Sequence, residues 1–216
     1  MSTATTTRPT EEGGATADVP VVVLPRRTID RVLIGFGIVA TVVFVAAGGL
    51  LTWGANFSND YVHDELSAQK VFFPDAAALK EEGRTDLLGF AGEQVTTGDE
   101  AEAYASYIDG HLQEIAGGKT YAEIDDRGAR AAVDEAKDSG ASEAEIAELQ
   151  ATADELTGQR DTLFKGETLR GLLLSSYAWS TIGRIAGIAS TVAFVAAAGM
   201  ALLSGAGIVH LRRARR

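Results

Sequence analysis

VLIGFGIVATVVFVAAGGLLTW at residues 32–53 and IAGIASTVAFVAAAGMALLSGAGIV at residues 185–209 decide the fold of this chain. The two runs contain 22 and 25 residues, and neither contains a charged side chain. A helix of 22 residues is about 33 Å long, which is enough to cross a hydrocarbon core of about 30 Å. Uncharged runs of this length are rare in the cores of soluble proteins. The sequence therefore predicts two transmembrane helices.

A cleaved signal peptide is the alternative interpretation of the first run. Its 22 residues exceed the apolar region of about 7 to 15 residues that a signal peptide carries. Arg26 and Arg27 precede it and resemble a twin-arginine signal, but paired arginines also precede many membrane helices. We therefore expect an uncleaved anchor.

The distribution of charge predicts the orientation in the membrane. Arginines precede the first run and follow the second, at positions 26, 27, 31, 212, 213, 215 and 216. Residues 54–184, by contrast, contain 26 acidic and 11 basic side chains. Cytoplasmic loops are enriched in Lys and Arg, so both termini are predicted to be cytoplasmic and residues 54–184 extracytoplasmic. The predicted location is the plasma membrane, with the lipid bilayer as one partner.

Composition excludes several classes of function. The chain of 216 residues contains no cysteine, which removes disulfides, thiol catalysis and Cys-ligated metals. Its net charge of −11, with no basic stripe in the outer segment, argues against nucleic-acid binding. No G-x-S-x-G motif or other catalytic constellation is present, so we expect no catalytic residue, no cofactor and no metal site.

Four residues near the predicted outer ends of the spans are expected to lie at the membrane interface. They are Trp53, Tyr177, Trp179 and Arg184. Indole and phenol rings favour the headgroup level, and an arginine at a helix end extends its side chain toward water. Ordinary packing in the outer domain is the alternative for Trp179.

The segments outside the spans differ in composition. Residues 1–31 are rich in Thr, Ala, Gly and Pro and are predicted to be a disordered cytoplasmic tail, while residues 210–216 form a short basic tail. Residues 54–184 are predicted to be a mostly helical domain. A helix is expected at residues 99–116, ended by Gly117 and Gly118.

Two capping boxes predict further helices in the outer segment. Thr120 with Glu123 begins a short helix, and Ser142 with Glu145 begins another that Gly158 is expected to end. Residues 129–157 are rich in Ala and Glu, and we expect them to form an exposed helical hairpin.

From Glu167 the apolar pattern continues into the second span. A helix over residues 167–209 would be about 64 Å long, too long for the bilayer alone. Leu169, Leu172 and Leu173 would then stand at or above the outer headgroups, where the rest of the domain or a partner must cover them.

Small residues recur in both spans. Gly183-x-x-x-Gly187 and Ala201-x-x-x-Gly205 fit the small-xxx-small pattern of packed membrane helices. We interpret them as favouring the pairing of the two spans with each other.

Two basic residues and a tyrosine are further interaction candidates. Lys119 follows Gly117 and Gly118 as in a P-loop, but the upstream glycine of that motif is replaced by Gln113. Lys119, Tyr121 and Arg170 therefore remain candidates for contact with an anionic group or a partner.

Three blocks of sequence carry a resemblance to a known family. They are FFPDAAAL, the stretch from FAGEQV to GGKTYAEI, and LFKGETLRGLLLSSYAWSTIG. The chain resembles a family of actinobacterial membrane proteins over its whole length between the tails, with a linker at about 127–158 that varies in length. The resemblance implies two transmembrane helices and an extracytoplasmic domain, and it implies no activity.

Some shorter relatives with a similar GGKTYAEL block are labelled aromatic ring-opening dioxygenases. Such enzymes hold non-haem iron by two histidines and a carboxylate. His63, beside Asp64 or Glu65, and His111 could supply these ligands, but no local spacing supports a site.

The sequence therefore predicts an all-α protein, a two-span transmembrane helical hairpin with a mostly helical extracytoplasmic domain. The expected role is a non-enzymatic interaction, scaffold or accessory protein of the cell envelope, with a membrane or envelope protein as partner. A membrane-tethered enzyme and a sensory or transport accessory subunit are the alternatives.

Overall fold

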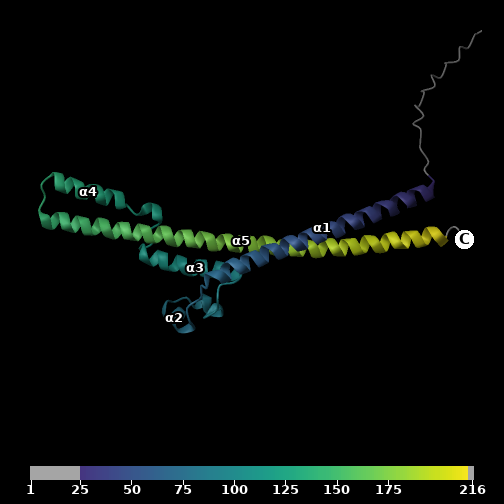
Figure 1. Cartoon of the computed structure of the whole chain (residues 1–216), viewed down its shortest axis with the longest axis horizontal. Helices are drawn as coiled ribbons and strands as arrows, with labels where there is room; N and C mark the ends of the chain where they lie inside the picture. The colour runs from purple at the N-terminus through teal and green to yellow at the C-terminus, as the bar shows by residue number, and fades with distance from the viewer. Residues whose placement is uncertain (1–24, 214–216) are drawn as a thin grey trace, which may run out of the picture.

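Two long helices dominate the computed structural model, which describes residues 25–213 (Figure 1). α1 (Arg26–Gln69) contains 44 residues and α5 (Glu143–Arg213) contains 71, so they are about 66 Å and 107 Å long. They pack antiparallel, and the start of α1 lies beside the end of α5. The described residues are helical with no strand, which confirms the all-α prediction.

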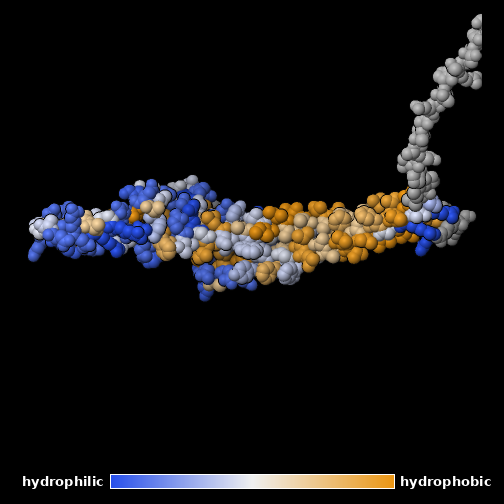
Figure 2. Space-filling view, turned by 90° about the horizontal axis from the view of Figure 1, so that it is seen from above, coloured by the Kyte–Doolittle hydropathy of each residue, from blue (hydrophilic) through white to orange (hydrophobic). Residues whose placement is uncertain are grey.

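The apolar halves of α1 and α5 are exposed. Both helices are long and apolar enough to cross a membrane, and only 11% of the apolar window of each is buried. Figure 2 shows this apolar surface as a continuous band, with hydrophilic surface beyond it at both ends. A helix in the core of a soluble protein would bury most of these side chains.

Small polar residues join the two helices along this band. The hydroxyls of Thr52 and Ser190 lie 2.6 Å apart, and both approach the carbonyl oxygen of Gly48 at 2.9 Å. Further along, the Ser58 hydroxyl donates to the carbonyl oxygen of Trp179 at 2.6 Å. These bonds fix the register of α1 against α5.

Glycines bring the two backbones close together. A Cβ at Gly48 would lie 3.0 Å from the ring of Phe194, and one at Gly207 would lie 2.9 Å from Ile34. Gly183 faces Ser58 and Gly187 faces Ala55, so the first small-xxx-small motif joins the two helices as predicted.

The second small-xxx-small prediction is wrong. Gly205 has no side-chain neighbour within 4 Å and Ala201 is exposed, because this pair lies on the face of α5 turned away from α1. Spacing alone identifies two residues on one helix face but does not say which face packs.

The ends of α1 and α5 extend beyond the apolar runs. α1 begins at Arg26, so residues 26–31, which we assigned to the tail, belong to a helix. α5 likewise continues through residues 210–213. The rest of the predicted tails, residues 1–24 and 214–216, lies outside the described residues.

α1 continues past its apolar run and ends at Gln69, within residues 54–184, which we call the outer part of the molecule. Lys70 then adopts a left-handed conformation with φ of +53°, and the chain turns into α2 (Ala76–Glu81) and the short 3-10 helix η1 (Thr85–Phe90). Asp75 caps α2 by accepting hydrogen bonds from the backbone of Ala77 and Ala78.

α3 (Gly98–Ile115) corresponds to the helix predicted at residues 99–116. Its start is a capping box formed by Thr97 and Glu100, which the sequence analysis did not include. Gly117 and Gly118 follow it with φ of +57° and +79°, and they stop the helix as predicted. α3 packs along α5.

The hairpin predicted at residues 129–157 is present. The 3-10 helix η2 (Tyr121–Glu123) has the expected capping box of Thr120 and Glu123, and it leads into α4 (Asp126–Asp138). α4 packs against the first turns of α5. At the start of α5 the backbone of Glu145 donates to the Ser142 hydroxyl at 3.3 Å, which is one half of the predicted box.

The predicted helix end at Gly158 is wrong, because α5 continues through this residue. Gln159 donates to the carbonyl oxygen of Ile115 at 2.6 Å, and Leu163 is buried against Leu112 and Ile124. These contacts with α3 and with the segment after it are made only if α5 stays helical past Gly158.

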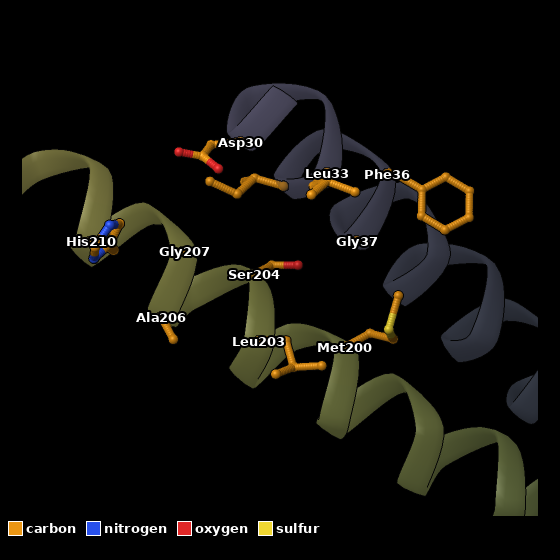
Figure 3. Close-up of a pocket in the computed structure, with 11 residues that line it drawn as sticks. Asp30, Leu33, Phe36, Gly37, Met200, Leu203, Ser204, Ala206, Gly207 and His210 are labelled. Carbon is orange, nitrogen blue, oxygen red and sulfur yellow. The ribbon is translucent and has the colours of Figure 1, made fainter. Parts of the chain in front are cut away.

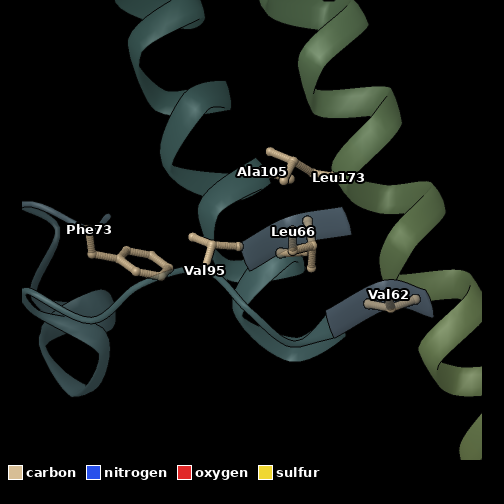
Figure 4. Packing of buried hydrophobic residues seen from close by; sticks show 7 residues of the cluster. Val62, Leu66, Phe73, Val95, Ala105 and Leu173 are labelled. Atoms are coloured by element: carbon tan, nitrogen blue, oxygen red, sulfur yellow. The ribbon is translucent and has the colours of Figure 1, made fainter. Parts of the chain in front are cut away.

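Two small clusters form the core of the outer part. The larger one joins α1, α3, α5 and the segments flanking α2 and η1 (Figure 4). Its buried members are Val62, Leu66, Phe73, Val95, Ala101, Ala105 and Leu173. The second is formed by Leu112, Ala116, Ile124 and Leu163.

Candidate partner-binding groove

An apolar groove of about 400 Å³ lies between α1 and α5 just beyond their apolar runs. We call it the outer groove. Four residues singled out from the sequence line it, namely Leu169, Leu172, Leu173 and Trp179. The remaining lining residues are Tyr61, Val62, Glu65, Leu66, Gln69, Ser175 and Ser176.

The leucines of the outer groove have different roles. Leu173 is buried in the core cluster with Val62 and Leu66, so the chain itself covers this side chain (Figure 4). Leu169 is 45% exposed and Leu172 is 63% exposed. The outer domain therefore covers one of the three predicted leucines and leaves two available for contact.

α1 supplies the other side of the groove, and its lining begins at Tyr61, which the sequence analysis did not single out. Tyr61 is the last ring of an aromatic row that begins outside the groove. Trp53, Phe57 and Tyr61 recur every fourth residue, and their ring centroids lie 5.7 Å and 6.2 Å apart. All three are more than half exposed. Residues four apart share one helix face, so the apolar period beyond Trp53 was the signal for this row.

The two tryptophans lie at different heights along the helix pair. Trp53 precedes Ser58 by five residues, or about 8 Å of helix, and Ser58 is bonded to the Trp179 carbonyl oxygen. Both indoles are more than half exposed, whereas Tyr177 is half-buried near the start of α3. The predicted anchors thus occupy a zone rather than a single level.

Arg184 forms an ion pair instead of standing free. Its Nη2 lies 2.6 Å from the Oδ1 of Asp99 in the first turn of α3. The hydrogen bond that Arg184 donates to Asp99, together with the negative charge of that carboxylate, raises the pKa of Arg184. This pair ties the start of α3 to α5 at the edge of the apolar band.

Arg170 also has partners within the chain. Its Nη1 lies 3.0 Å from the Oε2 of Glu167 and 3.5 Å from the Oδ1 of Asp109 on α3. Two carboxylates therefore already balance the charge that we considered for an anionic ligand.

The structure does not bring Lys119 and Tyr121 into the outer groove. Tyr121 lies nearer the outer end of α5, where the Arg160 guanidinium stands 4.5 Å from its ring centroid. Phe164 approaches the same ring at 6.0 Å. Lys119, two positions before Tyr121 in the sequence, is exposed.

The same guanidinium holds α4 in place. Arg160 Nη1 lies 2.6 Å from the Oδ1 of Asp126, whose residue is only 9% exposed. Burial raises the pKa of Asp126, but the hydrogen bond from Arg160 and the surrounding positive charge outweigh this effect, so the pKa lies below its usual value.

A polar pocket of about 380 Å³ between α2 and α3 contains His111. The Nε2 of His111 lies 3.8 Å from the Oε2 of Glu82, and the Tyr107 hydroxyl donates to the other carboxylate oxygen of Glu82 at 3.4 Å. His63 is exposed on α1. Among residues 25–213, no three His, Asp or Glu side chains are grouped so that they could hold a metal ion.

No family model, curated protein or solved structure matches this chain.

Proposed function

We propose that this chain is a two-span membrane protein that binds an apolar segment of a partner membrane protein in the outer groove. The observation that carries the proposal is the groove itself, where Leu169, Leu172 and Trp179 of α5 stay exposed, as does Tyr61 of α1. In this arrangement the protein acts as an interaction or accessory subunit of the cell envelope.

Membrane insertion is supported by the exposure of the apolar helices. Thr52, Gly48 and Ser190 satisfy one another's polar groups inside the apolar band, and the band has no charge of its own. Backbone groups in lipid must be satisfied internally, and two continuous helices meet this requirement.

The orientation with both termini in the cytoplasm is supported by the ends of the helix pair. The start of α1 and the end of α5 lie together and carry five arginines within the described residues, at positions 26, 27, 31, 212 and 213. The opposite part of the molecule carries the excess of acidic side chains. Positive charge on the cytoplasmic side then puts the outer groove outside the cell.

The position of the groove suggests the kind of partner. On α5 the lining extends from Trp179, six residues before the apolar run, back to Leu169. These residues lie about 9 to 24 Å along the helix from the start of the run. A partner helix that leaves the membrane beside α1 and α5 and continues outward would reach it without a bend. The groove would then cover apolar side chains of both proteins.

Crosslinking from a single position tests this proposal. The chain has no cysteine, so a photoreactive label can be attached to L172C in the groove or to L174C as the matched control. Leu174 is also an exposed leucine on α5, but it does not line the groove. In native membranes we expect one defined membrane-protein adduct from position 172, lost when L169E is added, and little of it from 174.

Equal crosslinking from both positions would contradict a specific groove. If the protein is inserted in the membrane but the label at position 172 crosslinks only to lipid, the proposal that a partner protein occupies the groove is contradicted.

A further inference from the structure

A smaller groove lies between α1 and α5 at the opposite end of the molecule from the outer domain. It has a volume of about 240 Å³ and is lined by Arg31, Ile34, Ile208, Leu211 and Arg212. We call it the arginine groove. It combines two guanidinium groups, one from each helix, with three aliphatic side chains.

The positive charge of this groove has no counter-ion in the described part of the chain. Neither Arg31 nor Arg212 is in an ion pair with any residue of 25–213. Other arginines of the molecule, such as Arg170 and Arg184, pair with carboxylates. Arg31 and Arg212 are both exposed, so an external anion can reach them.

A neighbouring groove on the same helix pair does not share the positive charge of the arginine groove. This larger groove, of about 510 Å³, shares Ile34 but carries Asp30 and His210 at its polar end (Figure 3). Its carboxylate disfavours an anion. Of the two grooves, only the arginine groove matches a negatively charged group.

The aliphatic side chains define the rest of the ligand. Ile34 packs into the notch at Gly207, and together with Ile208 and Leu211 it continues the apolar surface of the helix pair away from the arginines. A ligand that suits both parts has a phosphate at one end and a hydrocarbon chain at the other. Basic pockets between membrane helices on the cytoplasmic side bind anionic lipid headgroups.

We infer that the arginine groove binds one anionic phospholipid of the inner leaflet, with its phosphate on Arg31 and Arg212 and an acyl chain along Ile34, Ile208 and Leu211. The inference rests on the membrane insertion and the orientation included in the proposed function, but not on the partner in the outer groove.

Lipid binding by the purified full chain tests this inference. Native mass spectrometry in a neutral detergent would compare phosphatidylglycerol with phosphatidylcholine of identical acyl chains. We expect one phosphatidylglycerol to bind in preference to phosphatidylcholine. In R31Q/R212Q its affinity should fall about fivefold for each arginine removed.

R26Q/R27Q is the matched control, because it removes the same charge from the same end of the helix pair without touching the groove. It should reduce affinity much less than R31Q/R212Q. An equal loss in both variants, or no preference in the wild type, would overturn the site and leave only diffuse attraction. Competition by soluble glycerol phosphate at the same concentration would overturn a lipid ligand.

Failure of this inference is distinguishable from failure of the proposed function. A chain that alkaline carbonate removes from membranes contradicts membrane insertion itself. A chain that stays inserted but shows no preference for phosphatidylglycerol contradicts only the lipid site.

Discussion

Gly98, the first residue of α3, lies directly against α5. A Cβ at this position would overlap the Cβ of Ser180 and would lie 3.3 Å from the Cα of Tyr177. Neither atom can move without shifting the helix, so the absent side chain permits this contact. Gly171 on α5, by contrast, has no neighbour within 4 Å.

Gly98→Ala should therefore destabilise the outer domain, and Gly171→Ala should not. We expect a cost of about 1–3 kcal/mol for the first from overpacking. The second should be neutral or stabilising by up to about 1 kcal/mol, because alanine favours the helix. Urea unfolding in detergent, followed by circular dichroism, compares them, and equal midpoints would contradict the close contact.

Asp126 gives a pH-dependent contact between α4 and α5. Its pKa is lowered in the folded protein, so the pair with Arg160 stabilises the hairpin above the ordinary carboxyl pKa of 3.8 and is lost as the pH falls through the lowered value. A spin label at A131C, on the exposed side of α4, should become more mobile below this value.

In Asp126→Asn the same label should be mobile at neutral pH and should not respond between pH 5 and pH 2. A variant that keeps the wild-type pH midpoint would show that another group controls the hairpin.

At the scale of elements, α5 shows how packing overrides a local stop signal. Glycine ends a helix when it adopts a left-handed conformation, as Gly118 does with φ of +79°. Gly158 is instead helical, because the turns after it carry Gln159 and Leu163 to their partners on and after α3. Sequence alone could not distinguish these two glycines.

Substitution by alanine distinguishes them experimentally. Gly158→Ala should stabilise α5 by about 1 kcal/mol, because nothing lies within 4 Å and alanine is the better helix former. Gly118→Ala should destabilise, since its positive φ is strained for a residue with a Cβ. Loss of stability in Gly158→Ala, measured by the same unfolding experiment, would mean that the helix ends there after all.

At the scale of the whole molecule, α5 links the apolar band to the outer hairpin as one continuous helix. From Glu143 to the start of the second apolar run it contains 42 residues, or about 63 Å of helix. The hairpin of α4 and α5 is thereby held far from the proposed membrane surface. A rigid helix transmits position over this distance, whereas a flexible linker would not.

The orientation of α5 across the membrane is testable in intact cells. An impermeant maleimide should label S142C at the hairpin without lysis, and it should label T5C only after the membrane is opened. Because the chain has no cysteine, each variant carries one reactive group. The opposite labelling pattern would contradict the topology and, with it, an outer groove that faces the envelope.

Local patterns in the sequence were sufficient for the two apolar helices, the stop at Gly117 and Gly118, and the cap at Thr120, because each depends on residues a few positions apart. They also identified Leu169, Leu172 and Trp179 as candidates. They could not identify what those residues face.

Only the tertiary structure decided the contacts between distant segments. The pair of Arg184 and Asp99 spans 85 positions, Leu173 is buried against α1, and Arg31 and Arg212 line one groove from opposite ends of the chain. These contacts depend on the register in which α1, α3 and α5 pack. That register follows from side-chain shapes, such as Gly98 against Ser180 and Thr52 beside Ser190, which become neighbours only when the helices pack together.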